Sequence, residues 1–161
     1  MILFMSKSEE IVRYKRSRFS TRLPSNRIYT RSHYWLQKEE SGPWRVGLTK
    51  FATRMLGDLV EYEFAVGPED PVEIGQQIGW IEGFKAVSDL YSVAAGKFGG
   101  SNKELAGDIT LLESDPYGAG WLYAVDGEPE PGGLSVQEYV NVLDATIDRM
   151  LRSRGEGDSV G

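Results

Sequence analysis

Apolar and polar positions follow one pattern through most of the chain and a different one near its end. Between residues 28 and 127 the apolar positions form short runs, and turn residues separate these runs about every 8–12 positions. The runs lie at 28–36, 44–48, 59–65, 78–81 and 86–93. Many short strands separated by turns are typical of a β-sandwich or barrel, so the pattern predicts a mainly β fold.

Two segments show the signals of a helix instead. In residues 49–56, Thr49 can cap the first turn and Gly57 can end the last. From residue 135 onward, apolar side chains recur at helical spacing on one face, at Val136, Tyr139, Val140, Leu143, Ile147, Met150 and Leu151. Because Ser135 and Glu138 match the capping-box pattern, we predict a C-terminal helix over 135–152 and no long helix before it.

The organisation expected from these patterns has five parts. They are a basic N-terminal arm (1–27), a β domain (28–127), a linker (128–134), a C-terminal helix packed on the domain (135–152) and a flexible tail (153–161). The linker is predicted because residues 128–133 are dominated by Pro, Glu and Gly. A length of 161 residues is ordinary for one domain with its own core.

Charge is distributed unevenly along the chain. The net charge is −6, yet residues 1–31 hold eight Lys/Arg and two Asp/Glu, while the remainder holds ten and twenty-two. An acidic body argues against nucleic-acid binding. The basic arm is able to contact nucleic acid, a membrane surface or an acidic partner, but a solvated or partly wrapped arm is the simpler interpretation.

The residue types available exclude several kinds of chemistry. The chain has no cysteine and one histidine, His33, which excludes disulfides, thiolate nucleophiles and cysteine-ligated metals and leaves a zinc site without its second histidine. Glu61 and Glu63 lie on one face of a predicted strand, where a solvated surface is a better explanation than a catalytic carboxylate pair. No phosphate-binding glycine loop is present, and no apolar run approaches the ~18 residues of a membrane span. We therefore expect no catalysis by the chain itself and no metal site.

One lysine stands out by its position. In residues 81–89 (IEGFKAVSD), Lys85 lies between two predicted strands, with Gly83 expected to supply a positive-φ turn. Two interpretations follow from the residues alone: an ordinary surface lysine at a hairpin tip, or a lysine presented for covalent modification.

Six ordered blocks bear on that choice. They are 32–35 (SHYW), 47–49 with Ala52 (GLT and A), 56–60 (LGDLV), 82–91 (EGFKAVSDLY), 102–105 (NKEL) and 115–122 (DPYGAGWL). Through them the chain resembles the glycine cleavage H-protein family of small lipoyl carriers, from about residue 29 to 126. The resemblance implies a barrel-sandwich hybrid fold, like that of lipoyl domains, and lipoate bound covalently to Lys85 as lipoyl-lysine. Positions implied in recognition of the arm, or by the ligase, are Glu82, Gly83, Asp89, Ser32 and Tyr34.

The chain also departs from the family pattern. The family usually has Ser and Val where Gly83 and Phe84 stand, and an acidic residue that helps to hold the aminomethyl-loaded arm where Tyr34 stands. Losing that carboxylate weakens the case for an amine cargo. In these positions the chain is more similar to a divergent branch of lipoate-binding proteins linked to bacterial sulfur oxidation.

The resemblance implies different partners for the two branches. Either branch needs a lipoate-protein ligase or a lipoyl transferase. The sulfur branch, our first expectation, implies a heterodisulfide-reductase-like complex and dihydrolipoamide dehydrogenase. The alternative is the H-protein of the glycine cleavage system, with its P-, T- and L-proteins, and an unmodified structural module is a third possibility. A cytoplasmic bacterial protein is expected in each case.

Overall fold

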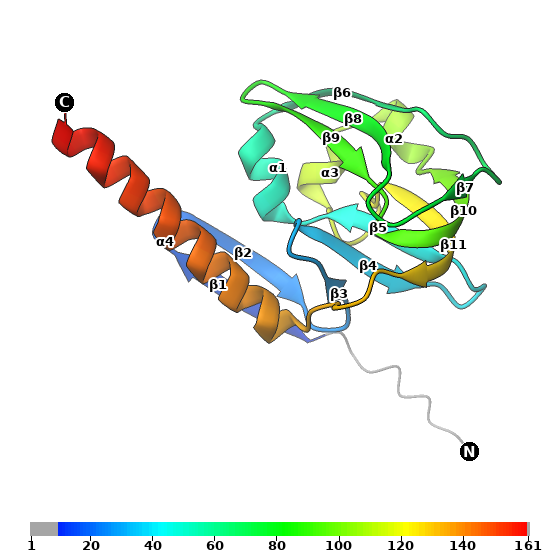
Figure 1. Ribbon diagram of the computed structural model, residues 1–161, viewed down its shortest axis with the longest axis horizontal. Helices are drawn as coiled ribbons and strands as arrows, with labels where there is room; N and C mark the ends of the chain where they lie inside the picture. The colour runs from blue at the N-terminus through cyan, green and yellow to red at the C-terminus, as the bar shows by residue number, and fades with distance from the viewer. Residues whose placement is uncertain (1–9, 161) are drawn as a thin grey trace, which may run out of the picture.

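The computed structural model describes residues 10–160, with side chains described to residue 155, and consists of a β-sandwich with a hairpin and a long helix at one side (Figure 1). Within that range the strands form three antiparallel sheets. The first is the hairpin of β1 (Ile11–Arg16) and β2 (Phe19–Pro24). The second has the order β3 (Ile28–Tyr29), β4 (Tyr34–Lys38), β5 (Trp44–Leu48), β11 (Tyr123–Pro129), β10 (Ala94–Ser101), β7 (Pro71–Val72). The third has the order β6 (Leu59–Phe64), β8 (Gln77–Gly83), β9 (Val87–Tyr91).

The second and third sheets enclose the main hydrophobic core. Alternate residues of their strands point inward, as the period of two requires. Phe98 on β10 lies at the centre, 5.4 Å from the ring of Phe64 and 5.8 Å from the ring of Tyr123. The predicted mainly β, sandwich-like fold with a short internal helix and a C-terminal helix is therefore confirmed.

The internal helix forms where the sequence predicts it. Helix α1 spans Lys50–Leu56, with Thr49 as its N-cap and Gly57, at φ 77°, as its C-cap. Two further helices of one turn, α2 (Glu104–Gly107) and α3 (Leu111–Ser114), were not predicted. The predicted strand over 28–36 is interrupted by a turn in which His33 adopts a φ of 71°.

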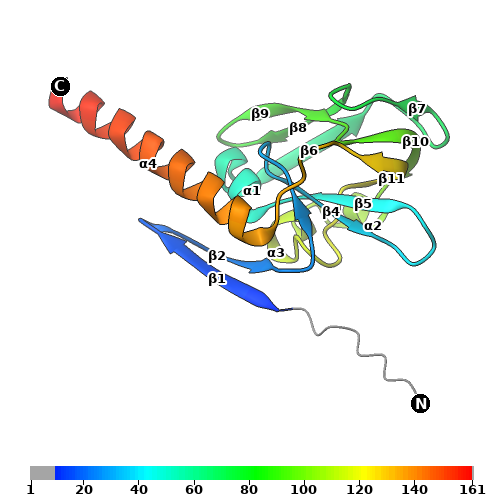
Figure 2. The ribbon, with the colours of Figure 1, turned by 60° about the horizontal axis from the view of Figure 1, so that its bottom comes forward.

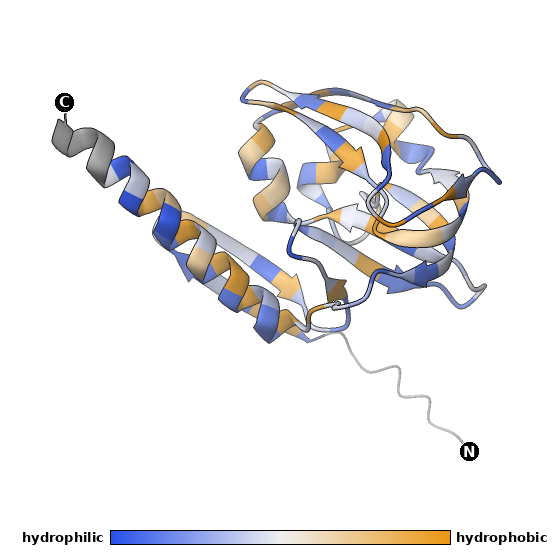
Figure 3. Ribbon diagram, in the orientation of Figure 1, coloured by the Kyte–Doolittle hydropathy of each residue, from blue (hydrophilic) through white to orange (hydrophobic). Residues whose placement is uncertain are grey.

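The basic N-terminal stretch differs from the expected arm, because residues 11–24 form a hairpin packed along the C-terminal helix (Figures 1 and 2). Tyr14, Phe19 and Leu23 are buried in a second hydrophobic cluster with side chains of α1 and the helix. Arg13, Lys15 and Arg22 are exposed on the opposite face, whereas Arg16 is half-buried and bonds to Asp148 on the C-terminal helix. Charged positions thus alternate with apolar ones along the hairpin (Figure 3), which explains why charge concealed the alternation.

The C-terminal helix α4 spans Val136–Val160. Its predicted capping box is present: the Ser135 N–H donates to Glu138 and the Glu138 N–H donates to Ser135 Oγ at 3.2 Å. The helix continues beyond residue 152, through the segment expected as a flexible tail, so Gly155 does not end it. Its far half extends away from the sandwich beside the hairpin (Figure 1). The boundaries between the five predicted parts stay predictions.

Candidate functional site

Lys85 lies at the tip of the β8–β9 hairpin, with its side chain in solvent. The Gly83 N–H donates to the Ala86 carbonyl at 2.9 Å and closes the turn, which we call the lysine tip (residues 83–86). Phe84 beside it is 80% exposed, although it is a large apolar residue. An exposed lysine beside an exposed aromatic ring is accessible to another protein.

The backbone of the lysine tip is held by the end of α1. The Lys85 N–H donates to the Leu56 carbonyl at 2.9 Å, and the Phe84 N–H donates to the Asp58 carbonyl at 2.9 Å. The last carbonyls of a helix have no partner within the helix, so the tip satisfies groups that would otherwise need water. The anchor fixes the backbone of Lys85 while its side chain stays free.

Gly83 is required for a different reason from the predicted one. Its φ is not positive, so the expected positive-φ turn geometry is wrong. A Cβ at this position would instead collide with the Leu56 carbonyl oxygen. Glycine therefore allows the hairpin to approach α1 closely enough for the Lys85 hydrogen bond to form.

Three hollows adjoin the lysine tip: two have a volume of about 340 Å³ each, and one, beside β9, has a volume of about 250 Å³. The hollow beside β9 is called the arm cleft. This arm cleft is lined by Ser32, His33, Tyr34, Leu48, Phe51, Ala52, Met55, Leu56, Ile81, Ala86, Ser88 and Leu90. No Asp or Glu is among these lining residues. Its surface is mostly apolar, and it begins directly beside the lysine, at Ala86.

The two titratable groups of the arm cleft are uncharged near neutral pH. Burial raises the pKa of Tyr34 to about 12, and its hydroxyl accepts the Tyr91 N–H at 3.0 Å. Burial lowers the pKa of His33 to about 4, and its Nδ1 lies 2.8 Å from the Tyr139 hydroxyl. The cleft therefore offers a neutral lining to whatever enters it.

The predicted recognition residues do not all meet in this cleft. Ser32 and Tyr34 line it, next to the lysine tip. Glu82 is half-buried on β8, paired in register with Val87. Asp89 does not line the cleft: it lies on the exposed face of β9, where it accepts from Gln77 at 3.0 Å. The recognition roles of these residues stay predictions.

Ser88, rather than Asp89, is the polar residue of β9 that lines the cleft, and the sequence analysis missed it. The signal was present, because Leu90 is buried and residues two apart on a strand share a face. Met55 and His33 were also missed as lining residues, since their placement depends on how α1 and the turn before β4 fold against the sandwich.

The fold and the lysine tip together define a small β-sandwich domain with Lys85 exposed at a hairpin tip. The glycine cleavage H-protein family model matches residues 27–142. The glycine cleavage system H protein of Aeromonas hydrophila is 37% identical over 131 residues, covering 76% of this chain and 96% of that protein. That of Mycobacterium leprae is 43% identical over 129 residues, covering 79% and 94%. The crystal structure of the Mycobacterium marinum H protein superposes with a TM-score of 0.67 at 35% identity, covering 74% of this chain and 97% of that one.

The chain belongs to the glycine cleavage H-protein family. Proteins of this family are non-catalytic carriers with lipoate bound covalently to a lysine, and as a member this chain is a lipoyl carrier. The link to the divergent sulfur-oxidation branch is not shown by these relatives. Among residues 10–160, no helix is long and apolar enough to cross a bilayer.

Proposed function

We propose that Lys85 is the lipoylated residue and that the chain acts as the H-protein of a glycine cleavage system. The observation that carries the proposal is the exposed Lys85 side chain on a backbone anchored to α1, inside the region that the family model matches. The partners implied are a lipoylating enzyme and then P-, T- and L-proteins.

The surroundings of Lys85 fit a lipoyl group. The arm cleft begins beside the lysine and is lined mainly by apolar side chains, which suits an aliphatic chain. The chain contains no cysteine, so a disulfide or dithiol function has to come from a cofactor. When bound, lipoate supplies that function, while the protein fixes its attachment point and shelters its aliphatic part. A tethered group reaches successive partner enzymes at high effective concentration.

Intact-mass measurement tests the attachment. Incubation with a lipoate-protein ligase, ATP and lipoate should add one lipoyl mass to the wild-type chain. Lys85→Arg keeps the charge and should stay unmodified, because an arginine forms no amide with lipoate. Lys97→Arg, at another exposed lysine on β10, is the matched control and should accept one lipoyl group. Modification of Lys85→Arg, or none of the wild type, contradicts the proposal.

Glycine turnover tests the system. The lipoylated protein, combined with P-, T- and L-proteins, should support glycine decarboxylation at a rate comparable with the H protein of a matched relative. The named relatives are all glycine cleavage H proteins, which favours this result. A fully lipoylated protein that supports no turnover would contradict the glycine role while leaving the attachment site intact.

One observation favours the second candidate, a carrier for sulfur intermediates served by a heterodisulfide-reductase-like complex. The arm cleft has no carboxylate lining it, and Tyr34 contributes a neutral, hydrogen-bonded phenol. An ammonium-bearing cargo would find no counter-charge there. If this candidate is right, the lipoylated protein fails with the glycine cleavage enzymes and remains inactive after Tyr34→Glu. If Tyr34→Glu gains glycine turnover, the result instead supports the glycine cleavage role.

A further inference from the structure

A second hollow is lined by Lys85 itself and shares Phe51 and Met55 with the arm cleft. It is an open groove of about 340 Å³ between the β1–β2 turn, α1 and the far half of α4. We call it the arginine groove; it is lined by Arg16, Ser17, Arg18, Phe19, Phe51, Arg54, Met55, Lys85, Ile147, Met150, Leu151 and Arg154. Most of these residues lie outside the region, 27–142, that the family model matches.

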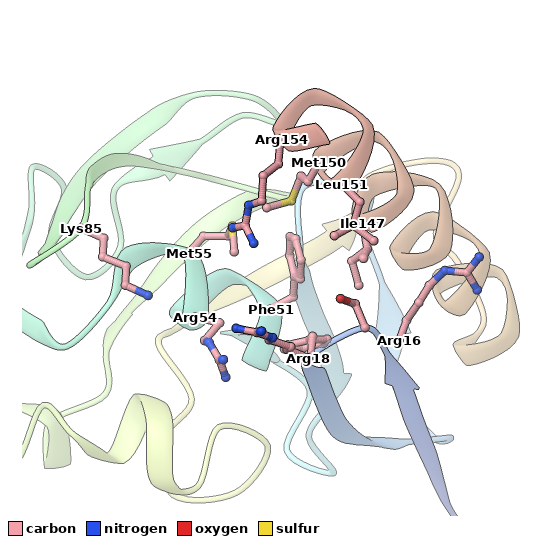
Figure 4. A pocket seen from close by; sticks show the side chains of 12 residues that line it. Arg16, Arg18, Phe51, Arg54, Met55, Lys85, Ile147, Met150, Leu151 and Arg154 are labelled. Carbon is pink, nitrogen blue, oxygen red and sulfur yellow. The ribbon is translucent and has the colours of Figure 1, made fainter. Parts of the chain in front are cut away.

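The floor of the arginine groove is apolar and its rim is cationic. Phe19, Phe51 and Ile147 are buried beneath it, whereas Met55 and Met150 are each 40% exposed at its surface. Arg18, Arg54 and Arg154 are exposed on three different elements that border it (Figure 4). The groove thus combines a surface for an aliphatic chain with positive charge.

Three of the four arginines of the rim form no ion pair with a described carboxylate. Arg16 is the exception: it pairs with Asp148 at 2.8 Å and Asp144 at 3.2 Å, and in Figure 4 it turns away from the other arginines. Among side chains that the structure describes, no ion pair joins Arg18, Arg54 or Arg154 to an acidic group, and no Asp or Glu lines the groove. Three guanidinium groups that line one groove, none of them in a described ion pair, favour an anion there.

The remaining charged groups near the tip lie elsewhere. Asp58 and Glu113 border a third hollow, which Lys50, Arg54 and Lys85 also line. Lys85 itself lines the arginine groove, and its side chain points toward Arg54 in Figure 4. Once its amine is joined to lipoate as an amide it loses its charge, so the field of the groove then comes from the arginines.

We propose that the arginine groove receives the distal end of the Lys85 arm in its reduced state, and that Arg18, Arg54 and Arg154 stabilise a dihydrolipoyl thiolate there. This inference rests on the lipoylation of Lys85 proposed above. The step is an acid dissociation: a thiol of the arm loses its proton to water, and the guanidinium groups stabilise the negative sulfur. Because the thiolate is the reactive form of a thiol, the groove tunes the arm toward exchange with disulfides and electrophiles.

The pH dependence of alkylation tests this inference. Lipoylated protein is reduced with a phosphine, freed of reductant and treated with iodoacetamide at a series of pH values, with incorporation followed by mass. We expect the midpoint of the pH–rate profile to lie about one unit below that of free dihydrolipoamide. Raising the salt concentration should move it back toward the free value.

Matched variants separate the groove from overall charge. Arg18→Gln/Arg54→Gln should return at least half of the shift. Arg13→Gln/Arg22→Gln removes the same charge from an exposed register pair of the hairpin outside the groove and should leave the midpoint unchanged. A wild-type midpoint equal to that of free dihydrolipoamide, or an equal response of both double variants, overturns the inference.

Methyl NMR locates the arm independently of reactivity. Met150 lines the arginine groove but not the arm cleft, whereas Ile81 lines the cleft but not the groove. On reduction of the lipoylated protein, the Met150 methyl signal should shift relative to the unmodified protein. A shift confined to Ile81 overturns the inference. The intact mass is measured before both experiments. If the protein stays unmodified, the lipoylation of Lys85 and this inference are both overturned. If it is lipoylated and the groove experiments fail, only this inference is overturned.

Discussion

The two hydrophobic clusters of this molecule are stabilised by different means. The sandwich core lies between sheets whose strands are paired residue by residue along their lengths. The second cluster joins a two-stranded hairpin to α4 and α1, and no strand of the hairpin pairs with the sandwich. An isolated two-stranded hairpin is at best marginally stable in water. The attachment of the hairpin therefore depends on side-chain contacts, while the sandwich sheets are extended by backbone pairing from strand to strand.

Polar side chains connect the second cluster to the body. The Tyr139 hydroxyl lies 2.8 Å from both His33 Nδ1 and Thr49 Oγ1, and the Tyr139 ring stacks on Tyr29 at 4.8 Å. Tyr14 on the hairpin donates to Asp144 on α4 at 2.8 Å. We infer that the sandwich is the body that positions Lys85, and that the hairpin and α4 form an attached unit that opens separately.

The largest effect is expected in the sandwich core. Phe98→Ala should lower the free energy of unfolding by about 3–5 kcal/mol, because it leaves a cavity between two aromatic rings. Urea unfolding followed by fluorescence and circular dichroism measures the change. Both signals should move together, since loss of the sandwich removes the support of every element. A change below about 1 kcal/mol would contradict the central role of Phe98.

A similar truncation in the second cluster should act more locally. Leu143 is fully buried on α4, and Leu143→Ala should cost about 2–5 kcal/mol of packing. Hydrogen exchange should accelerate in β1 and β2 while amides of β10 and β11 keep their protection. Equal acceleration in all four strands would show that the two clusters open as one unit.

Acid should weaken the contact between α4 and the sandwich, because His33 lies between them. Its pKa is lowered to about 4 by burial, so the unfolded chain, with an ordinary value near 6.5, binds the proton more readily. Stability should therefore fall as the pH is lowered from about 6.5 to about 4, by roughly 2–3 kcal/mol in this range. His33→Asn, which tolerates the positive φ of this position, should remove that part of the slope. Urea midpoints measured across this range test it, and an unchanged slope would contradict the assignment.

The smallest effect concerns the ion pair of the hairpin. The Arg16 guanidinium holds the pKa of Asp148 below its usual range, so the pair contributes stability above about pH 4 that is lost at lower pH as Asp148 becomes protonated. Asp148→Asn should remove this pH dependence and slightly accelerate exchange in β1. Asp126→Asn, at an exposed carboxylate of the sandwich, serves as the control and should change neither.

Features with local signals could be predicted from the sequence. The bounds of β5, both caps of α1, the capping box of α4 and the hairpin presenting Lys85 all follow from neighbouring residues. The resemblance to the family added the lipoyl carrier function, and the comparisons bear that out while favouring the glycine system over our first expectation of sulfur oxidation.

The remaining features depend on contacts between distant residues. The hairpin was missed because its buried positions alternate with arginines and lysines, and a charged alternation also suits a solvated arm. The role of Gly83 depends on the Leu56 carbonyl, 27 positions earlier. The arginine groove brings together residues near positions 18, 54 and 154, and no sequence spacing relates these three segments.

The close approach of Gly83 to Leu56 also decides where the arm pivots. A swinging group sweeps a volume centred on its attachment point, and here that point is drawn against the end of α1. A Cβ at position 83 would collide with the Leu56 carbonyl oxygen, so the tip and the end of α1 would have to separate, and the swept volume would shift with the tip. The absence of a side chain at position 83 thus sets the position of the attachment point. Gly83→Ala should leave Lys85 exposed and modifiable, but should change the part of the protein surface that the arm can reach.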